Sequence, residues 1–260
     1  MKTEKIALNK KKLFIFILSY NHQKTIMNVL KRIPKETWQA SSEVLIADDA
    51  SSDNTFEEAL EYKKENKISK LTIIKHEKNK GYGGNQKFAY NYAVSRGYDI
   101  AVMLHGDLQY PPEYILPLAK LFDNPEVGMA FGSRMSGHPI KGGMPLYKFF
   151  GNIFLTTVEN IVLGTHLTEF HSGFRAYSTS ALKQIPFDKN SDDFHFDSEI
   201  IVQMATAKKK IKEITIPTRY GDEKCNVNSI KYGFNVLNVM LEYILHKLKI
   251  RRYEKFEIKD

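Results

Sequence analysis

The stretch Met103-Leu-His-Gly-Asp-Leu-Gln-Tyr-Pro-Pro-Glu113 gives the clearest indication of the fold of this 260-residue chain. The apolar run at residues 100–104 is short and continuous, which is typical of a fully buried strand, and Pro111-Pro112 then interrupts regular structure. Asp107 therefore follows directly on a buried strand. Open α/β sheets bind their ligands at this position, outside the carboxyl ends of the strands.

Three side chains of this stretch are candidate ligands for a divalent cation. Asp107 and Gln109 offer oxygen atoms and His105 offers a ring nitrogen, a set that suits a cation beside a nucleotide diphosphate. Taken alone, the same residues are equally consistent with a strand cap and a loop. The rest of the chain has to decide between the two interpretations.

Short apolar runs alternate with helical patterns along the first half of the chain. The runs predict strands at residues 13–18, 43–47, 71–74, 100–104 and 127–131. Helices are predicted at residues 25–31, at 55–66 with a capping box Thr55-x-x-Glu58, and from the turn Gly81-Tyr-Gly-Gly84 to Arg96-Gly97. Repeated strand–helix units predict a Rossmann-like α/β fold, with a mainly parallel central sheet and helices on both faces.

Two amphipathic segments in the second half have a different character. One covers residues 147–163. The other covers residues 236–250, and its apolar stripe consists of Leu237, Met240, Leu241, Ile244, Leu245 and Leu248, with basic residues at its end. Such segments are consistent with helices on a membrane interface, with core packing, or with a contact between two copies of the chain. Neither is long and apolar enough to span a bilayer.

The composition is that of an ordinary globular protein, with 42% hydrophobic and 26% charged residues. The single cysteine, Cys225, excludes an internal disulfide and favours a reducing compartment, and residues 1–12 contain no apolar run typical of a signal peptide. The net charge of +8 suits an anionic partner such as nucleotide phosphates or an acidic membrane surface. No nucleic-acid recognition motif accompanies this charge, so we expect no nucleic-acid partner.

The common glycine-rich nucleotide sites are excluded. No G-x-x-x-x-G-K-[ST] occurs, and the glycines at 81, 83 and 84 neither match G-x-G-x-x-G nor follow the first strand. Acids stand at strand ends instead: Asp48, Asp49 and Asp53 after the second strand and Asp107 after the fourth. A carboxylate accepts the imino proton of uracil or guanine, which cytosine lacks, so this pattern favours a UDP- or GDP-linked ligand.

Motifs spread along the chain follow one another in a family-like order. They are Ser19-Tyr-Asn-His22, Ala47-Asp-Asp-Ala-Ser-Ser-Asp-Asn-Thr55, Asn79-Lys-Gly-Tyr-Gly83, Gly106-Asp-Leu-Gln-Tyr-Pro-Pro-Glu113, Gly132-Ser-Arg134 and His171-Ser-Gly-Phe-Arg-Ala-Tyr177. Together they resemble glycosyltransferase family 2, in the branch of dolichol-phosphate mannosyltransferase and the bacterial polyprenyl-phosphate glycosyltransferases. The resemblance extends from about residue 12 to residue 224.

The resemblance implies a GT-A fold, a nucleotide-sugar donor, Mg²⁺ or Mn²⁺ as cofactor, and inversion at the anomeric carbon. Carried over by position, the nucleotide sugar is held by Ser19, Tyr20, Asn21, Asp48, Asp49, Gly81, Asp107 and Gln109. The metal ligands are Asp107 and Gln109, with His105 standing where the family usually has the first acid of an Asp-x-Asp motif. The missing carboxylate predicts weaker binding of a hard cation.

The resemblance also assigns residues around the phosphates. Arg134, Arg175, Arg219 and Lys224 match cationic positions near the diphosphate and the acceptor phosphate, and Ser172 adds a hydroxyl. Guanidinium groups fork onto phosphate oxygens and neutralise the charge of a leaving diphosphate. Glu199 is the candidate base, with His171 and Asp197 as alternatives, so the expected catalytic residues are Asp107, Arg134, Arg175 and Glu199.

Two acceptors remain open. A polyprenyl phosphate, dolichyl or undecaprenyl, is already anionic at neutral pH and needs no base, whereas a sugar hydroxyl in a polysaccharide or glycan requires one. The arginines and amphipathic helices favour the lipid phosphate, and Glu199 favours the hydroxyl. A nucleotidylyltransferase is disfavoured because Ser19-Tyr-Asn-His22 replaces its glycine-rich loop, and a non-catalytic nucleotide-sugar or lipid-binding module is the remaining alternative.

The expected organisation is a glycosyltransferase domain at residues 1–225, followed by an amphipathic helix and basic tail at 226–260. Within the domain, residues 12–135 form the nucleotide-sugar half and 136–225 the acceptor half. We expect a cytoplasmic protein bound peripherally to the inner face of the membrane, with self-association through the amphipathic helices as a further expectation.

Overall fold

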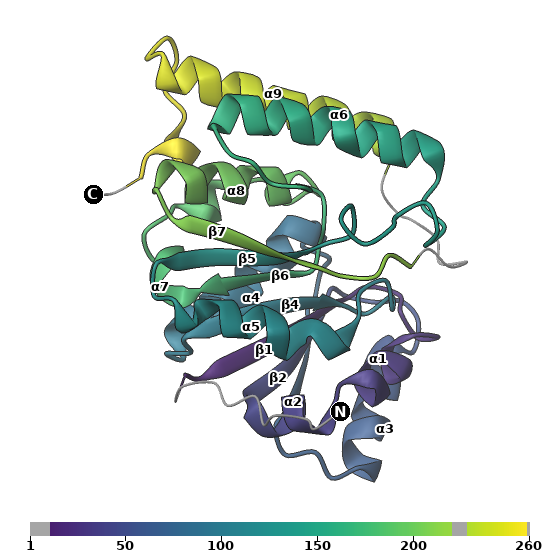
Figure 1. Cartoon of the computed structure of the whole chain (residues 1–260). Helices are drawn as coiled ribbons and strands as arrows, with labels where there is room; N and C mark the ends of the chain where they lie inside the picture. The colour runs from purple at the N-terminus through teal and green to yellow at the C-terminus, as the bar shows by residue number, and fades with distance from the viewer. Residues whose placement is uncertain (1–10, 220–227, 259–260) are drawn as a thin grey trace.

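The computed structural model describes residues 11–219 and 228–258. A seven-stranded sheet with the order β3-β2-β1-β4-β6-β5-β7 forms its centre (Figure 1). The strands are β1 Leu13–Ser19, β2 Ser41–Asp48, β3 Leu71–Lys75, β4 Ile100–His105, β5 Val127–Ser133, β6 Arg175–Ser178 and β7 Lys210–Thr215. All neighbours are parallel except β6, which runs antiparallel to β4 and β5. The predicted mainly parallel α/β fold is confirmed, and β6 and β7 are added to the predicted strands.

The helices cover both faces of this sheet. They are α1 Ile26–Arg32, α2 Lys35–Ala40, α3 Thr55–Glu65, α4 Gly81–Ser95, α5 Ile115–Lys120, α6 Leu146–Leu163, α7 Thr179–Leu182, α8 Phe196–Thr206 and α9 Ser229–Lys247. In β1, residues 13, 15 and 17 pack toward α1, α3 and α5, whereas residues 14, 16 and 18 pack toward α4, α7 and α8. Alternate side chains of a strand point to opposite faces, so a strand buried on both faces is continuously apolar.

Three local expectations change in detail. The predicted capping box is wrong, because Thr55 is the first residue of α3 and its buried hydroxyl bonds Asp53 instead. The glycines of the predicted turn form the first turn of α4 itself, where added Cβ atoms at 81 and 83 would lie within 2.5 Å of carbonyl oxygens of residues 191–192. Gly97, with φ +68°, follows the C-cap of α4 as predicted.

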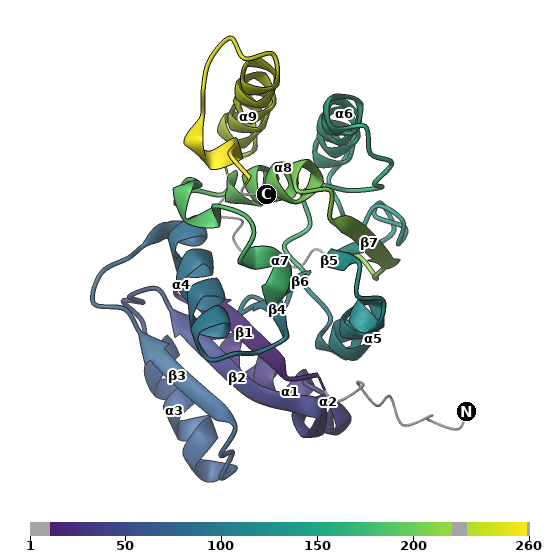
Figure 2. The same cartoon turned by 90° about the vertical axis from the view of Figure 1, so that its left-hand side faces the viewer.

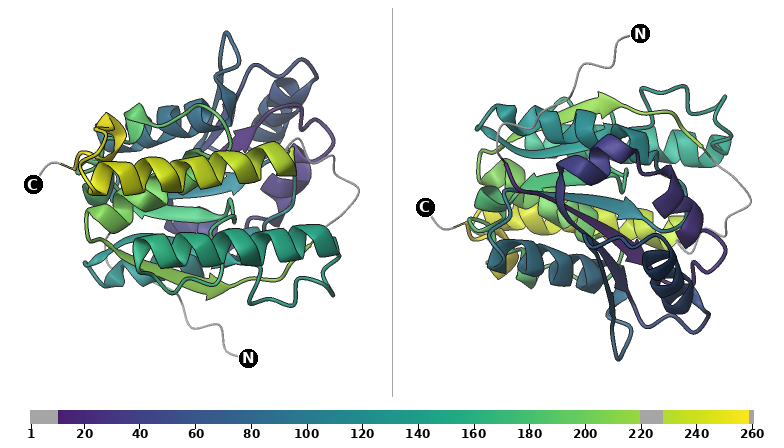
Figure 3. Two further views of the ribbon diagram at one scale, coloured as in Figure 1. Left: turned by 90° about the horizontal axis from the view of Figure 1, so that it is seen from above. Right: turned by 90° about the horizontal axis from the view of Figure 1, so that it is seen from below.

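The amphipathic segments α6 and α9 lie side by side above α8 and form an outer layer (Figures 2 and 3). Val239, Met240 and Tyr243 of α9 face inward and pack with Val202 of α8 and Phe256, and Val236 is also buried. α9 begins at Ser229 rather than at residue 236. Among the helices of the described ranges, none is long and apolar enough to cross a bilayer.

The outer sides of these two helices carry a second apolar stripe. We call it the α6–α9 apolar face, and it consists of the exposed residues Leu146, Tyr147, Phe150, Ile153, Phe154 and Ile161 of α6 and Ile230, Phe234, Leu241, Ile244 and Leu248 of α9. The stripe predicted from the sequence is thus divided: Met240 is buried, whereas Leu241, Ile244 and Leu248 are exposed. Core packing explains the first part, whereas the second part is left exposed among residues 11–219 and 228–258.

Candidate active site

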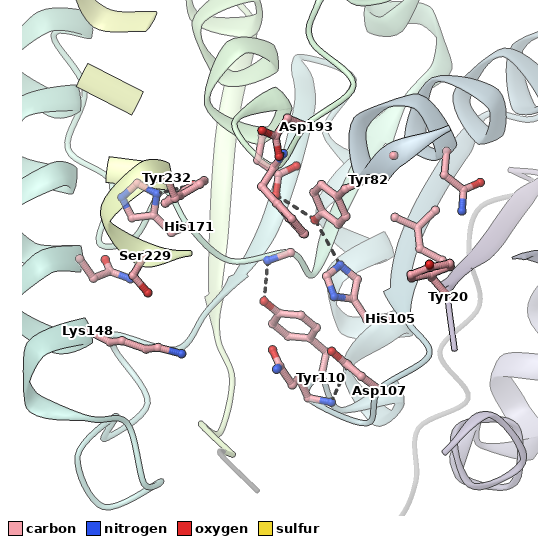
Figure 4. A pocket seen from close by; sticks show the side chains of 18 of the residues that line it. Tyr20, Tyr82, His105, Asp107, Tyr110, Lys148, His171, Asp193, Ser229 and Tyr232 are labelled. Atoms are coloured by element: carbon pink, nitrogen blue, oxygen red, sulfur yellow. Dashed lines mark hydrogen bonds between the residues drawn. The ribbon is translucent and has the colours of Figure 1, made fainter. Parts of the chain in front are cut away.

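A cavity of about 970 Å³ lies where β1 and β4 end. Its wall on one side is built by the ends of these strands and by the start of α4, and on the other side by α6 and the start of α9 (Figure 4). The first side carries Tyr20, Tyr82, His105 and Asp107, and the second carries Lys148, Asn152, His171, Ser229 and Tyr232. The cavity therefore joins the half predicted to bind the nucleotide sugar to the half predicted to bind the acceptor.

Asp107 and Gln109 line this cavity just beyond β4, as predicted. Leu108 between them has a φ of +65°, and the backbone N–H of Gln109 donates to Oδ1 of Asp107 at 3.0 Å. This tight turn holds the carboxylate at the strand end. Among the described residues, no lysine or arginine forms an ion pair with Asp107, so its negative charge is available to a bound cation.

His105 is the start of a hydrogen-bond chain that sets its tautomer. The Tyr82 hydroxyl donates to Oδ2 of Asp197 at 3.0 Å, and Nε2 of His105 lies 3.2 Å from the same hydroxyl. The hydroxyl has one proton and gives it to the carboxylate, so Nε2 must carry the proton that it donates to Tyr82. Burial lowers the pKa of His105, which keeps the ring neutral and leaves Nδ1 unprotonated.

The nucleotide end of the cavity is lined by several predicted residues but not by all. Ser19, Tyr20, Asp49 and Gly81 line it, together with His22, Asn79 and Asn85. Burial raises the pKa of Asp49, although its Oδ1 accepts the backbone N–H of Lys80 at 2.7 Å. Asp48 and Asn21 do not line the cavity: Asp48 Oδ1 accepts the N–H of Ser51 and Asn21 Oδ1 accepts that of Ser52. These hydrogen bonds shape the loop, and the role of both residues as nucleotide contacts stays a prediction.

Arg134 is a predicted cationic residue that lines the cavity. Its guanidinium bonds Glu169 and donates to the carbonyl of His171 at 2.8 Å. Glu169 is fully buried, and burial alone would raise its pKa, but the charge and the N–H donors of Arg134 lower it. The ionised pair fixes Arg134 at the wall of the cavity.

Arg175 has a different position from the one expected. It is 1% exposed and does not line the cavity. Its guanidinium donates to the carbonyls of Phe170, Ser172 and Asp197 at 2.6–2.7 Å, and lies 3.5 Å from the Asp197 carboxylate. These donors point into the protein rather than into the cavity, and they fix the chain before β6 to α8. The contact of Arg175 with a phosphate stays a prediction that this position does not favour.

Glu199 also lies away from the cavity. Its carboxylate accepts the N–H of Ser191 at 2.7 Å and pairs with Lys255 at 2.8 Å. The role of Glu199 as a base stays a prediction that these contacts do not favour. Ser172 is buried outside the lining, and its Oγ accepts the N–H of Phe174. Arg219 is exposed and does not line the cavity either. Lys224 lies outside the described residues.

A family model described as Glycosyl transferase family 2 matches residues 14–186 of the chain. The chain belongs to this family. The expected resemblance is thereby confirmed, and the protein is a glycosyltransferase.

This family 2 glycosyltransferase is similar in sequence to two named relatives and in structure to one solved protein. It is 29% identical to the UDP-N-acetylglucosamine--dolichyl-phosphate N-acetylglucosaminyltransferase of Methanococcus voltae, over 89% of this chain and 95% of that protein. It is 25% identical to the undecaprenyl-phosphate mannosyltransferase of Micrococcus luteus, over 77% and 80%. Glucosyl-3-phosphoglycerate synthase of Mycobacterium tuberculosis, solved with Mn²⁺ and UDP-glucose, superposes with a TM-score of 0.67 over 90% and 79%, at 14% identity. This likeness confirms the GT-A fold.

The cavity of this glycosyltransferase fits a divalent cation that is shared with a ligand. Within the described ranges, no three His, Cys, Asp or Glu side chains are grouped to hold a metal ion by themselves. Mg²⁺ is commonly bound by one or two carboxylates together with substrate phosphates, and Asp107 with Gln109 can supply the protein's part. His105 fits less well, because its Nε2 is bonded to Tyr82 and only Nδ1 is left as a ligand.

The acceptor-side residues of the site were not found from the sequence. Lys148 and Asn152 of α6 and Tyr232 of α9 line the cavity, and Glu169 holds Arg134, but none stands in a motif that indicates chemistry. These residues come from helices whose spacing shows only that they are amphipathic. The signal that identifies them is their shared cavity.

The buried ion pair of Arg175 with Asp197 predicts a loss of stability when the arginine is removed. We expect Arg175→Ala to lower the free energy of unfolding by about 3–5 kcal/mol, because the Asp197 carboxylate loses its buried partner. Arg252→Ala is the matched control, since Arg252 forms an ion pair with Glu257 at the protein surface, where water screens the attraction and the pair adds little to stability. Urea unfolding of both variants measures the difference, and equal stabilities would contradict the structural role.

Proposed function

We propose that this glycosyltransferase moves a sugar from a UDP- or GDP-linked donor to a polyprenyl phosphate, with inversion and with the help of Mg²⁺ or Mn²⁺. The alternative is transfer to a sugar hydroxyl during polysaccharide or glycan assembly. The names of the relatives support the first acceptor, since one acts on dolichyl phosphate and the other on undecaprenyl phosphate. The choice between the acceptors is argued from the cavity below.

The observation that carries this proposal is the continuity between the cavity and the α6–α9 apolar face. Tyr147 and Ile230 belong to both: they line the cavity and are 67% and 75% exposed. Phe150 and Phe234, one helical turn further along each helix, are 63% and 70% exposed. A cavity with an apolar rim suits an acceptor whose phosphate enters while its hydrocarbon chain stays outside. A sugar hydroxyl on a polar glycan gains nothing from such a rim.

The acids of the acceptor side also support a phosphate. Asp197 accepts the Tyr82 hydroxyl and an N–H of Gln86, both at 3.0 Å, and Glu199 is held by Lys255. Neither of these two acids is free to take a proton from a sugar hydroxyl. A phosphate monoester has a second pKa near about 6 and is already an anionic nucleophile at neutral pH.

In the proposed reaction, an oxygen of the acceptor phosphate attacks the anomeric carbon from the side opposite the diphosphate. The new C–O bond forms as the bond between the anomeric carbon and the diphosphate oxygen breaks, which inverts the configuration. Arg134, fixed by Glu169, offers positive charge at the cavity wall for the phosphates. Asp107 and Gln109 would hold the cation, and when bound it would supply positive charge for the departing nucleoside diphosphate.

The division into residues 1–225 and 226–260 stays part of this proposal, with one refinement. The helix α9 packs on α6 and α8, and its start forms a wall of the cavity, so the C-terminal segment contributes to the site. We further propose a cytoplasmic enzyme on the inner face of the membrane. The basic residues Lys247, Lys249, Arg251 and Arg252 stand beside the α6–α9 apolar face and suit anionic lipids.

Metal dependence is tested at Asp107. We expect Asp107→Asn to lower transfer by about 10²–10³-fold, because the cation loses its anionic ligand. The variant should also lose the rise in melting temperature that Mn²⁺ adds to UDP, while its melting temperature without ligands stays unchanged. His105→Asp should tighten Mg²⁺ binding. Asp123→Asn, at an exposed position outside the cavity, is the control, and near-normal turnover of Asp107→Asn in EDTA would contradict a metal-assisted reaction.

The acceptor is tested by assaying the purified protein with farnesyl phosphate and with a glycan bearing free hydroxyls. Both acceptors are combined with a panel of UDP- and GDP-linked sugars and Mn²⁺. We expect product with farnesyl phosphate only, and a rate that rises between about pH 5 and 7 as the acceptor phosphate ionises. Transfer to the glycan with no product from farnesyl phosphate would overturn the proposal in favour of the hydroxyl acceptor.

The membrane role of the α6–α9 apolar face is tested by flotation with vesicles that contain phosphatidylglycerol. We expect the protein to float, more weakly at high salt, and the double variant Phe150→Ser/Phe234→Ser to lose most binding because it removes exposed apolar area. Leu60→Ser is the control, since Leu60 is 42% exposed on α3, away from this face. Equal flotation of all three proteins would point to a contact between copies of the chain instead.

A further inference from the structure

One acid of the cavity has no part in the reaction derived above. Asp193 stands in the loop that precedes α8, and its side chain lines the cavity (Figure 4). Its Oδ1 accepts the backbone N–H of Phe194 at 2.7 Å, and its Oδ2 lies 3.6 Å from Nζ of Lys231 at the start of α9. The lysine side chain is 71% exposed and that of Asp193 40%, and their contact exceeds hydrogen-bond distance. The lysine therefore holds this carboxylate only weakly.

The other acids that line the cavity already have a partner or a role. Asp49 lies at the nucleotide end, and Asp107 is the proposed ligand of the cation. Asp192 pairs with a lysine at 2.8 Å, and Asp197 accepts two side-chain hydrogen bonds at 3.0 Å. Within residues 11–219 and 228–258, no side chain donates a hydrogen bond to Asp193. Its carboxylate is thus open to a ligand in the cavity.

The main chain of this loop is held against two helices. The N–H of Gly83 in α4 donates to the carbonyl of Asp192 at 2.8 Å, and a Cβ atom at position 83 would collide with the carbonyl oxygen of Ser191. On the other side, the Glu199 carboxylate of α8 accepts the N–H of Ser191 at 2.7 Å. A fixed backbone therefore presents the side chain of Asp193 to the cavity, which lowers the entropy cost of binding a ligand there.

Aromatic rings accompany the carboxylate. Phe194 stacks on Tyr82 with ring centroids 5.0 Å apart, and both rings line the cavity. A sugar ring has hydroxyl groups around its edge and C–H groups on its faces, so a carboxylate beside aromatic rings suits it. Because an ionised carboxylate only accepts hydrogen bonds and has two oxygens, it can accept from two hydroxyls at once.

The position of Asp193 agrees with that of the sugar in the proposed reaction. The transferred sugar has to lie between the diphosphate at Asp107 and an acceptor that enters beside the α6–α9 apolar face. Asp193 stands where these two sides meet, since the neighbouring Phe194 packs on Tyr82 of the donor side and Asp193 itself reaches α9.

We propose that Asp193 accepts hydrogen bonds from hydroxyl groups of the transferred sugar and thereby selects an uncharged sugar over a uronic acid. The proposal rests on the donor half of the function proposed above and does not depend on the acceptor. Two hydroxyls of the sugar replace the weak contact with Lys231, whereas the carboxylate of a uronic acid is repelled by Asp193. Asp193 is therefore a specificity-determining residue.

The first test separates the sugar from the nucleotide. Calorimetric titrations with Mn²⁺ compare UDP and GDP with UDP-N-acetylglucosamine, UDP-glucose and GDP-mannose. For the sugar nucleotide that the wild type binds best, we expect Asp193→Ala to raise the Kd about tenfold to a hundredfold, as for the loss of a hydrogen bond to a charged group. The Kd for the nucleoside diphosphate should stay unchanged. An unchanged Kd for the sugar nucleotide would overturn the proposal, and so would a wild type that binds UDP or GDP but none of the three sugar nucleotides.

Two further variants distinguish a contact with the sugar from the ion pair. Lys231→Met removes the partner of Asp193 but leaves the carboxylate, and Lys231 does not line the cavity. Asp188→Asn changes an exposed acid outside the cavity and is the matched control. We expect both variants to bind the sugar nucleotide as the wild type does. If Lys231→Met lost as much affinity as Asp193→Ala, Asp193 would act only through its ion pair and the proposal would be wrong.

The third test concerns charge. UDP-glucuronate carries a carboxylate where UDP-glucose carries a hydroxymethyl group. We expect the wild type to prefer UDP-glucose about tenfold or more, because like charges repel in the cavity, and Asp193→Asn to reduce this preference. An equal preference in both proteins would contradict selection by Asp193. No acceptor is present in these titrations, so an inert farnesyl phosphate would overturn the polyprenyl-phosphate acceptor alone, and a wild type that binds neither UDP nor GDP would overturn the proposed donor.

Discussion

The buried guanidinium of Arg175 is the interaction on which both sides of the cavity depend. It satisfies the carbonyls of Phe170 and Ser172 and the main chain and carboxylate of Asp197 in one place. The segment before β6 cannot form regular hydrogen bonds where it crosses from α6 to the sheet, and its carbonyls would otherwise be buried without donors. The planar guanidinium of Arg175 has five N–H donors and can bond several of these carbonyls at once, whereas lysine has only three donors on a single nitrogen.

The segment before β6 and its partner Asp197 position residues on both sides of the cavity. Toward the donor side, Asp197 holds Tyr82, and Tyr82 fixes the tautomer of His105. Toward the acceptor side, the same stretch contributes Glu169, which holds Arg134, and His171, which contacts α6 and α9. The buried ion pair of Arg175 and Asp197 thus supports two groups of residues in the proposed reaction. One group meets the nucleotide sugar and the other meets the acceptor. Such preorganisation keeps charged groups in place without rearrangement during the reaction.

The outer layer shows how one helix serves two environments. In α9, the inward stripe through Val239, Met240 and Tyr243 packs on α8, and Leu241 and Leu248 face outward. A single period of apolar residues would satisfy core packing alone, so the second stripe has a separate cause. The proposed contact with lipid supplies one, and it places the start of α9 and the rim of the cavity at the membrane surface.

The sequence alone determined the central sheet, because it depends on local pattern. Continuous apolar runs identified β1 to β5, and acids directly after those runs placed Asp49 and Asp107 at the strand ends that line the cavity, since the ends of parallel strands converge by geometry. Only the tertiary structure decided which basic and acidic residues face the cavity. Arg134 and Arg175 look alike in sequence, yet one lines the cavity and the other is 1% exposed, because a long side chain takes its partners from distant segments. Tyr232 stands in no motif, and its contact with His171 exists because α9 packs over α8 beside α6.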